Sequence, residues 1–274
     1  MIRTKEVHKQ KEEIERKNKD ITDSINYAQR IQFSVLPTSA TLLSHCSEAF
    51  IFYRPRDIVS GDFYWFDYFH ETDRLLIVCA DSTGHGVPGA FMSLIGATLI
   101  KDITRRPDVK NPADLLYCLD QSVQSTLNQN RDSEQTHDGM DIIVCDINTK
   151  TNLLRIASAM RPYIVYQGGN RTIYKGSRAS IGGLHYTDSE TKVFDLNEIQ
   201  LAKGDTLYMY SDGYADQFGG PDGKKMKTNR LYNILNDIQN RDMNEQHRVL
   251  QENFYLWKGD TEQVDDVLMI GVKI

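Results

Sequence analysis

The chain has 274 residues, of which 40% are hydrophobic and 26% are charged, and its formal net charge is −6. This composition is typical of a globular protein, and the length suits one large domain or two small ones. Nucleic-acid-binding domains usually have a basic face, so the negative charge argues against that class of protein. No apolar stretch reaches the ~20 residues of a membrane span and the N-terminus is too polar for a signal peptide, so we expect a cytoplasmic chain with no membrane segment.

Residues 6–35 contain no glycine or proline and predict one long helix that ends before Pro37. The apolar residues of this helix form a single narrow stripe: Ile14, Ile21, Ile25, Ala28, Ile31 and Val35. A helix with so thin a stripe must pack on the following domain or on a second copy of itself. We therefore divide the chain into an N-terminal helical linker, residues 1–40, and a domain, residues 41–274. The linker is a candidate coiled coil and homodimer interface, and it would also suit attachment to an upstream sensor domain.

From residue 48 onward, short β-branched and aromatic runs alternate with polar turns, which is typical of strands. We predict strands at 49–54, 61–69, 74–81, 140–147, 153–158, 162–167, 171–175, 193–196, 205–212 and 267–274. Helices are predicted at 87–103, from the N-cap residue Asn111 onward, and twice within 227–257. Strands and helices do not alternate regularly, so the order favours an α+β fold with two stacked, mainly antiparallel sheets and helices outside.

Aspartates stand at the ends of several predicted strands: Asp62, Asp81, Asp212, and the pair Asp265 and Asp266. One aspartate in such a place is usually a turn or cap residue, but several buried carboxylates are costly unless they are paired or bind a cation. Clustered oxygen ligands with few His or Cys residues suit Mg²⁺ or Mn²⁺. Two such ions can activate a water molecule and hold a phosphoryl oxygen, so the pattern predicts metal-assisted hydrolysis without naming the substrate.

Six segments then agree in order and spacing with one family: SGDFYWF (60–66), ADSTGHGVPGAF (80–91), GMDIIVCDI (139–147), SIGGL (180–184), GDTLYMYSDGYADQFGG (204–220) and DDVLMIGV (265–272). With these segments, residues 24–274 resemble the PPM-type (type 2C) protein phosphatases, most closely the sporulation stage II E/RsbU branch. The resemblance implies an α-β-β-α sandwich and two divalent cations, Mn²⁺ or Mg²⁺. It also implies that a metal-bridging water hydrolyses a phosphoserine or phosphothreonine monoester on a regulatory protein, often of the anti-sigma-factor-antagonist type.

The resemblance assigns candidate roles by position. Metal ligands would be Asp62, Asp81, Asp212, Asp265 and the backbone carbonyl of Ser82, with Asp81 bridging the two ions. His85, in a glycine-flanked loop, is a candidate general acid, or else a loop histidine that bonds the backbone. Third-metal or outer-shell roles fall to Asp216, Asp141 and Asp266, and phosphate binding to Arg54 and Arg56. For Asp216, Arg54 and Arg56 the plain alternative is an ordinary loop or surface residue.

The chain departs from the family pattern in two places. SAMRP (158–162) replaces the usual Asn-Ala-Gly-His-Asn-Pro-like block, and Leu268 replaces a threonine. Because the proposed ligands are all retained, we expect an active phosphatase that is regulated through its N-terminal helix. A non-catalytic phosphoprotein-binding module with the same fold is the alternative. A two-metal nuclease or phosphodiesterase would use the same chemistry, but the net charge and the resemblance argue against it.

Overall fold

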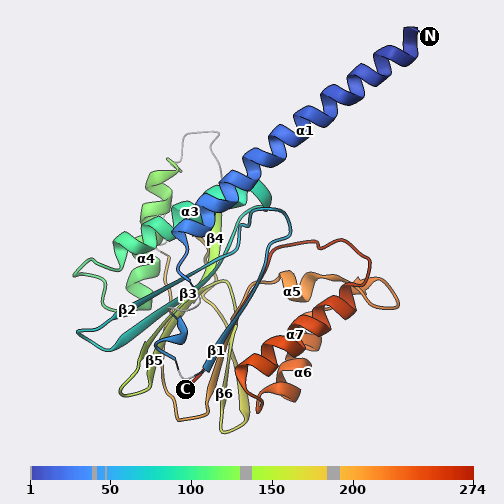
Figure 1. The fold of residues 1–274 in the computed structure, drawn as a ribbon. Coiled ribbons are helices and arrows are strands. Elements are labelled where there is room, and N and C mark those ends of the chain that lie inside the picture. The colour runs from blue at the N-terminus through green and yellow to red at the C-terminus, as the bar shows by residue number, and fades with distance from the viewer. Residues whose placement is uncertain (1, 39–41, 47, 130–137, 184–191) are drawn as a thin grey trace.

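The computed structural model describes residues 2–38, 42–46, 48–129, 138–183 and 192–274. The predicted boundary between residues 40 and 41 lies outside the described residues. Within the described ranges, two sheets lie face to face and each has helices on its outer side (Figure 1). The predicted α-β-β-α sandwich is therefore confirmed.

Each sheet has a simple antiparallel order. The first sheet runs in the order β2 (Phe63–Phe69), β3 (Arg74–Ser82), β4 (Gly139–Asn148), β5 (Leu153–Ala159) and β9 (Leu196–Gln200), with β8 (Ile181–Gly182) pairing beside β4. The second runs in the order β1 (Glu48–Arg54), β13 (Val267–Lys273), β10 (Thr206–Tyr210), β6 (Tyr163–Gln167) and β7 (Asn170–Tyr174). The first and last strands of the domain, β1 and β13, are neighbours, so their pairing joins the two ends of the domain.

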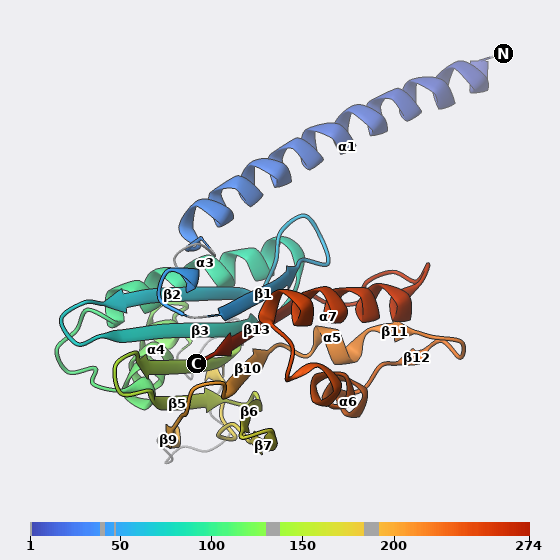
Figure 2. The same cartoon turned by 60° about the horizontal axis from the view of Figure 1, so that its bottom comes forward.

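The helices form the outer layers. On the first sheet lie α3 (Gly86–Ile103) and α4 (Pro112–Thr126), and on the second lie α6 (Thr228–Ile238) and α7 (Met243–Lys258), as Figure 2 shows from a second side. The short helix α5 (Gly213–Asp216) and the hairpin of β11 (Phe218–Gly219) and β12 (Lys224–Lys225) connect β10 to α6. As predicted, Asn111 caps α4: its side-chain oxygen accepts hydrogen bonds from the backbone of Ala113 and Asp114.

Hydrophobic side chains alternate between two core layers along the central strands. In β4, Ile142 and Val144 pack under α3 and α4, whereas Ile143 and Cys145 pack between the sheets. A third core layer lies between the second sheet and helices α6 and α7. Leu268, whose side chain is fully buried in the layer between the sheets, serves this packing rather than the site. The strands are thus fixed on both faces, and only their ends are free to carry polar chemistry.

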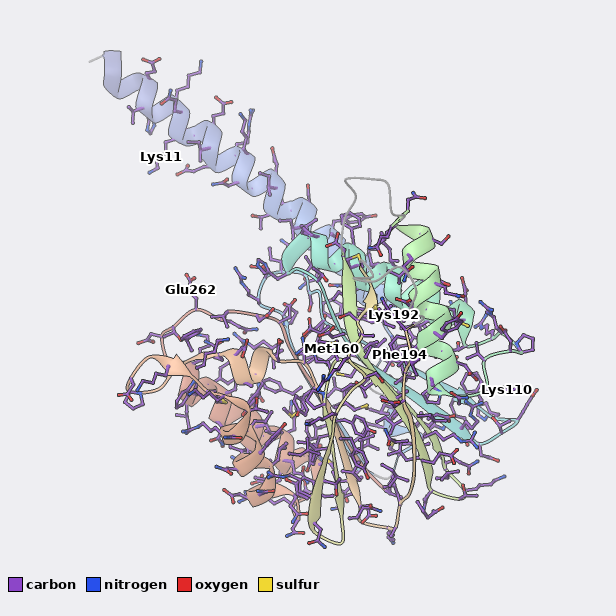
Figure 3. All side chains as sticks on the ribbon, turned by 180° about the vertical axis from the view of Figure 1, so that it is seen from behind. Lys11, Lys110, Met160, Lys192, Phe194 and Glu262 are labelled. Carbon is purple, nitrogen blue, oxygen red and sulfur yellow. The ribbon has the colours of Figure 1, made fainter. Side chains whose placement is uncertain are left out.

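The predicted N-terminal helix is confirmed as α1 (Ile2–Val35), which projects far from the domain (Figures 1 and 2). Side chains near Lys11 stand clear of every other element (Figure 3). The apolar side chains of Val7 and Ile14 are 64% and 58% exposed, whereas Val35 and Leu36 pack into the core beside α3. The helix is therefore anchored to the domain only at its C-terminal end.

One predicted strand differs from the structure. The predicted strand at 193–196 is wrong: residues 192–195 are irregular beside α4 and the strand β9 begins at Leu196 (Figure 3). The reason is that the Asp195 backbone N–H donates to the Ser177 hydroxyl and Phe194 packs into the core, so neither joins a ladder.

Among the described residues, α3 has the length and composition of a membrane span, but much of it is buried against the first sheet and α4.

Candidate active site

Strand registers bring three aspartates of the first sheet together. Phe63 pairs with Ala80 in the β2–β3 ladder, so Asp62 and Asp81 are the next residues at the same end of that ladder. Asp81 lies directly opposite Asp141 in the β3–β4 ladder. Like charges directly opposite each other destabilise a sheet unless a cation lies between them. The register therefore requires positive charge at this end of the sheet.

The second sheet brings two more aspartates to the same place. Asp212 follows the end of β10 and Asp265 precedes the start of β13, and these two strands are antiparallel neighbours. The two sheets are joined here by a buried hydrogen bond, in which the Ser211 hydroxyl donates to Oδ2 of Asp62 over 2.6 Å. The aspartates that come from distant parts of the sequence thus share one end of the sandwich.

Arg161 lies among these carboxylates, and the sequence analysis did not assign it a role. Its Nη2 is 2.7 Å from Oδ2 of Asp81, and its Nη1 is 2.7 Å from Oδ2 of Asp212. Its Nε is 3.3 Å from Oδ2 of Asp141. The sequence contained a signal: an arginine that follows an apolar strand, as the aspartates do, inside the segment that departs from the family pattern.

Burial, with repulsion between neighbouring carboxylates, raises the pKa values of the clustered aspartates. Burial raises the pKa of Asp62 well above its ordinary value, and repulsion from Asp81 raises it further. Burial also raises the pKa of Asp81 to about 7, with Arg161 opposing the rise and Asp212 adding to it. Burial raises the pKa of Asp141 and of Asp265 in the same direction. One guanidinium therefore leaves the cluster short of positive charge.

The adjacent residues Asp265 and Asp266 have different surroundings. Asp266 is buried, and its two carboxylate oxygens each accept a 2.7 Å hydrogen bond from a backbone N–H, one of Arg56 and one of Gly61. It thereby fixes the loop that carries Asp62. Asp265 is partly exposed, and its Oδ1 accepts only the backbone N–H of Asp266, at 2.9 Å. Of the two, Asp265 has the carboxylate that is free to bind an ion.

Two glycine-rich loops pack tightly beside the cluster. A Cβ atom on Gly61 would lie 2.4 Å from the carbonyl oxygen of Gly84, and one on Gly89 would lie 2.2 Å from the same oxygen. Only glycine permits such close backbone contact, so the loop of Asp62 and the loop of His85 are held against each other. His85 is exposed at their rim, and its Nδ1 is 3.1 Å from Oδ2 of Asp57.

The remaining predicted residues lie around the site rather than in it. Arg54 donates to Oε1 of Gln263 over 2.6 Å and stacks on Tyr255. The Arg56 side chain donates to the carbonyl of Val264. Within the described chain, neither guanidinium forms an ion pair with the clustered aspartates.

The two aspartates Asp216 and Asp141 have different surroundings. Asp216 is paired with Lys225 over 2.8 Å at the surface. Asp141, by contrast, is part of the cluster, and its Oδ1 accepts a hydrogen bond of 2.9 Å from Ser180. The structure thus brings Asp141 into the cluster and leaves Asp216 engaged with a lysine at its edge.

The donor chemistry of the cluster fits divalent cations. All its ligating atoms are oxygens, the choice of Mg²⁺ and Mn²⁺, and the buried hydroxyl of Ser82 has no hydrogen-bond partner. Nevertheless, no three acidic, His or Cys side chains in the described ranges lie in a ready metal-binding arrangement. Three of the carboxylates, those of Asp81, Asp141 and Asp212, instead each have an oxygen close to a nitrogen of Arg161.

The fold and the cluster of carboxylates at the ends of its strands together define the class: a phosphatase domain of the PP2C type. Comparison with known proteins agrees. The sequence profile of the family described as stage II sporulation protein E (SpoIIE) matches residues 71–274. The chain belongs to this family and is a protein serine/threonine phosphatase. A comparison with curated protein sequences gives no match.

Solved structures give the same picture. The chain is similar to the SiaA-PP2C domain of Pseudomonas aeruginosa, with 30% identity and a TM-score of 0.81 over 94% of this chain and 98% of that one. It shares its fold with the SpoIIE phosphatase and partial regulatory domain of Bacillus subtilis, with 17% identity and a TM-score of 0.63 over 83% and 63% of the chains. RsbX in complex with magnesium has the same fold, with 14% identity and a TM-score of 0.53 over 82% and 94%.

Proposed function

We propose that this phosphatase uses two divalent cations, Mn²⁺ or Mg²⁺, to hydrolyse a phosphoserine or phosphothreonine monoester on a regulatory protein. One observation carries the proposal: carboxylates from both sheets converge at one end of the sandwich with a single cation among them. The residues that would hold the ions are Asp62, Asp81, Asp212, Asp265 and the backbone carbonyl of Ser82. Bound ions would supply an acidified water molecule and charge neutralisation for the phosphoryl group.

Several residues of the chain prepare the site without touching substrate. Ser211 orients the carboxylate of Asp62 with a 2.6 Å hydrogen bond, and Asp266 holds the loop before it through two backbone N–H groups. These contacts would hold the carboxylate of Asp62, a proposed ligand, in one orientation.

His85 is the candidate donor of a proton to the leaving serine or threonine oxygen. Its Nδ1 lies 3.1 Å from the carboxylate of Asp57, which would set the orientation of the ring. With Nδ1 occupied, Nε2 is the nitrogen left for the substrate. The exposed position at the rim of the cluster suits a group that meets a protein substrate.

The first test is hydrolysis of p-nitrophenyl phosphate with and without Mn²⁺. We expect turnover that requires the metal and that is lost in Asp62→Asn and Asp212→Asn. Asp222→Asn is the matched control, because Asp222 is exposed and pairs only with Lys224 in the described structure. Equal turnover in the parent with Mn²⁺ and with chelator would refute metal dependence, and preference for a phosphodiester would point to the alternative hydrolase.

The substrate proposal rests on family membership: a small phosphorylated regulator of the anti-sigma-factor-antagonist type. A panel of proteins and peptides phosphorylated on serine, threonine or tyrosine tests it by phosphate release. We expect release from phosphoserine or phosphothreonine and little from phosphotyrosine. Faster release from phosphotyrosine would contradict the proposal.

Regulation through the N-terminal helix is supported by contacts that two glutamines of α1 make with the domain. Gln32, almost fully buried, donates to the carbonyl of Ser60 over 2.6 Å and accepts the backbone N–H of the same residue. Gln29 donates to the carbonyl of Ile58, also over 2.6 Å. Both contacts reach the loop that ends in Asp62. A shift of α1 would therefore move the backbone next to a metal ligand.

We further propose that a second copy of the chain packs on the exposed stripe of α1. Val7, Ile14, Ile21 and Ala28 recur at intervals of seven residues, and Asn18 falls between them at a position where polar residues favour two-stranded coiled coils. We expect the double variant Ile14→Asp/Ile21→Asp to be monomeric by light scattering and changed in activity. Arg16→Ala/Asp23→Ala, on the opposite face, is the control. A parent chain that is already monomeric would refute this interface.

A further inference from the structure

Arg161 is one cation shared by three carboxylates of the candidate metal site. Two of its nitrogens are each 2.7 Å from an oxygen of Asp81 or Asp212, and the third lies 3.3 Å from Asp141. The side chain is only 18% exposed, so solvent screens these contacts weakly. The two 2.7 Å contacts have the length of charge-assisted hydrogen bonds, which are among the stronger polar interactions in proteins, whereas the buried Nε has no hydrogen-bond partner among the described residues.

The backbone around Arg161 holds it in this place. Met160, in the middle of the view in Figure 3, has a φ of +66°, a conformation that few non-glycine residues adopt, and its N–H donates to the carbonyl of Ser177. The Arg161 carbonyl accepts the hydroxyl of Ser158 over 2.5 Å, and its N–H donates to Ala159. A hydrogen-bonded turn of the backbone therefore positions the guanidinium among the carboxylates.

The other part of the cluster has no such cation. Within the described residues, Asp62 and Asp265 form no ion pair, and the side chain of Asp62 accepts a hydrogen bond from Ser211. The buried hydroxyl of Ser82 nearby is without a partner. The cluster thus has two unequal halves: one around Asp62 and Asp265 that lacks positive charge, and one in which Arg161 supplies it.

We propose that Arg161 is an internal competitor for divalent cations. Its guanidinium offsets part of the negative charge of Asp81, Asp141 and Asp212, and a divalent cation that binds these carboxylates must displace it. This inference rests on the proposed metal-dependent function and adds a property to it: Arg161 lowers the affinity most for the cation that must take both Asp81 and Asp212 from it.

The physical reason is that two cations cannot hold the same carboxylates at short range. Each approach of a divalent ion meets the repulsion of the guanidinium, and the displaced guanidinium loses its short contacts with Asp81 and Asp212. When no metal ion is bound, the same contacts reduce the repulsion among these carboxylates. Arg161 therefore stabilises the metal-free fold and weakens the second cation site at the same time.

Calorimetric titration of the full chain with Mn²⁺ tests the proposal, together with the melting temperature in chelator. The variants are Arg161→Gln, which removes the charge, and Arg161→Lys, which keeps it without the forked geometry. Arg155→Gln is the matched control, because Arg155 is exposed on β5 and pairs with Glu198 away from the cluster. For Arg161→Gln we expect the weaker Mn²⁺ event to tighten about tenfold or more and the metal-free melting temperature to fall. Arg161→Lys should lie between it and the parent, and Arg155→Gln should match the parent's Mn²⁺ affinity.

The possible results distinguish competition by Arg161 from the proposed metal-dependent function. If the parent binds Mn²⁺ and Arg161→Gln leaves the weaker event unchanged or weakens it, Arg161 is no competitor, although the proposed metal-dependent function stands. If the parent binds no Mn²⁺ at all, both the proposed function and this inference fail. Tightening in Arg161→Gln that is equalled in Arg155→Gln would also overturn the inference, since it would reflect only the lost surface charge.

Discussion

Strands β3 and β4 are neighbours along their whole length, and their two ends have opposite electrostatics. At one end Arg74 binds the buried carboxylate of Asp146, with its Nε 2.8 Å and 3.0 Å from the two oxygens. At the other end Asp81 and Asp141 face each other and share Arg161 with Asp212. The first end has one arginine for one carboxylate, and the second has one arginine for three.

This difference separates structure from function within a single ladder. A buried carboxylate with a bidentate arginine is balanced and needs no further partner. A cluster with excess negative charge is costly to fold, and the raised pKa of Asp81 reports that cost. Proteins retain such costly groups mainly where they act, so the imbalance points to the reacting end of the sandwich. Substitutions at the two ends should therefore have opposite effects on activity and on stability.

The largest expected effect is that of Asp81→Asn on catalysis. We expect Mn²⁺-dependent turnover of p-nitrophenyl phosphate to fall about a thousandfold, ~4 kcal/mol of transition-state stabilisation, because the central carboxylate of the cluster is lost. The metal-free protein should not lose stability, since a repelled charge is removed. Retention of more than about a tenth of the parent's turnover would show that Asp81 is not a ligand.

Metal binding should stabilise the parent but not this variant. A cation that binds only the folded state at about 100 times its Kd contributes about 2.7 kcal/mol, which is a rise of several degrees in Tm. Differential scanning fluorimetry with Mn²⁺ and with chelator measures the rise. Asp81→Asn should show much less of it. An equal rise in both proteins would place the metal elsewhere.

At the balanced end, Asp146→Asn should act in the reverse manner. Removal of this carboxylate leaves the half-buried guanidinium of Arg74 without its partner, and we expect a loss of about 2 kcal/mol in the free energy of unfolding. Turnover at a temperature well below the melting point should stay near that of the parent. Urea denaturation measures the stability and the hydrolysis assay measures the turnover. A large loss of turnover without unfolding would contradict the proposed difference between the two ends of the ladder.

The smallest effect concerns pH. Folding raises the pKa of Asp81 from 3.8 to about 7, so this group binds more protons in the folded state than in the unfolded state. Its contribution to the stability of the metal-free protein is present at low pH and is lost as the pH rises through that window. Other groups titrate there too, so the useful quantity is the difference between parent and Asp81→Asn in the change of Tm from about pH 5 to about pH 8. The parent should lose more, and identical slopes would contradict the raised pKa.

The sequence predicted the elements whose side chains repeat with a clear period. Alternation in the central strands, the N-cap of α4 and the long run without Gly or Pro in α1 are local signals, and each was followed by the expected structure. The error at 193–196 shows the limit: four residues cannot tell a strand from an extended connection. What decided there was the bond between Asp195 and Ser177, residues far apart in the chain.

Site residues were predicted as types and places rather than as contacts. Adjacent residues such as Asp265 and Asp266 have the same local pattern. Only the tertiary structure shows that the carboxylate oxygens of Asp266 accept the backbone N–H groups of Arg56 and Gly61. The contacts of Arg161 with the clustered aspartates could not be predicted for the same reason. Its partners Asp81, Asp141 and Asp212 are separated from it by 80, 20 and 51 positions in the printed sequence, and no local pattern reports such contacts.

The sequence by itself determined where strands end in carboxylates, which family segments are present and where the exposed stripe of the first helix lies. These properties depend on periodicity and residue type, which are local. The tertiary structure alone decided which carboxylates share a cation, which one is committed to the backbone, and that Gln32 links α1 to the loop of Asp62. Those are distances between segments remote in the chain, and they exist only once the sheets have paired and packed, because short-range electrostatics depends on separation and burial rather than on order.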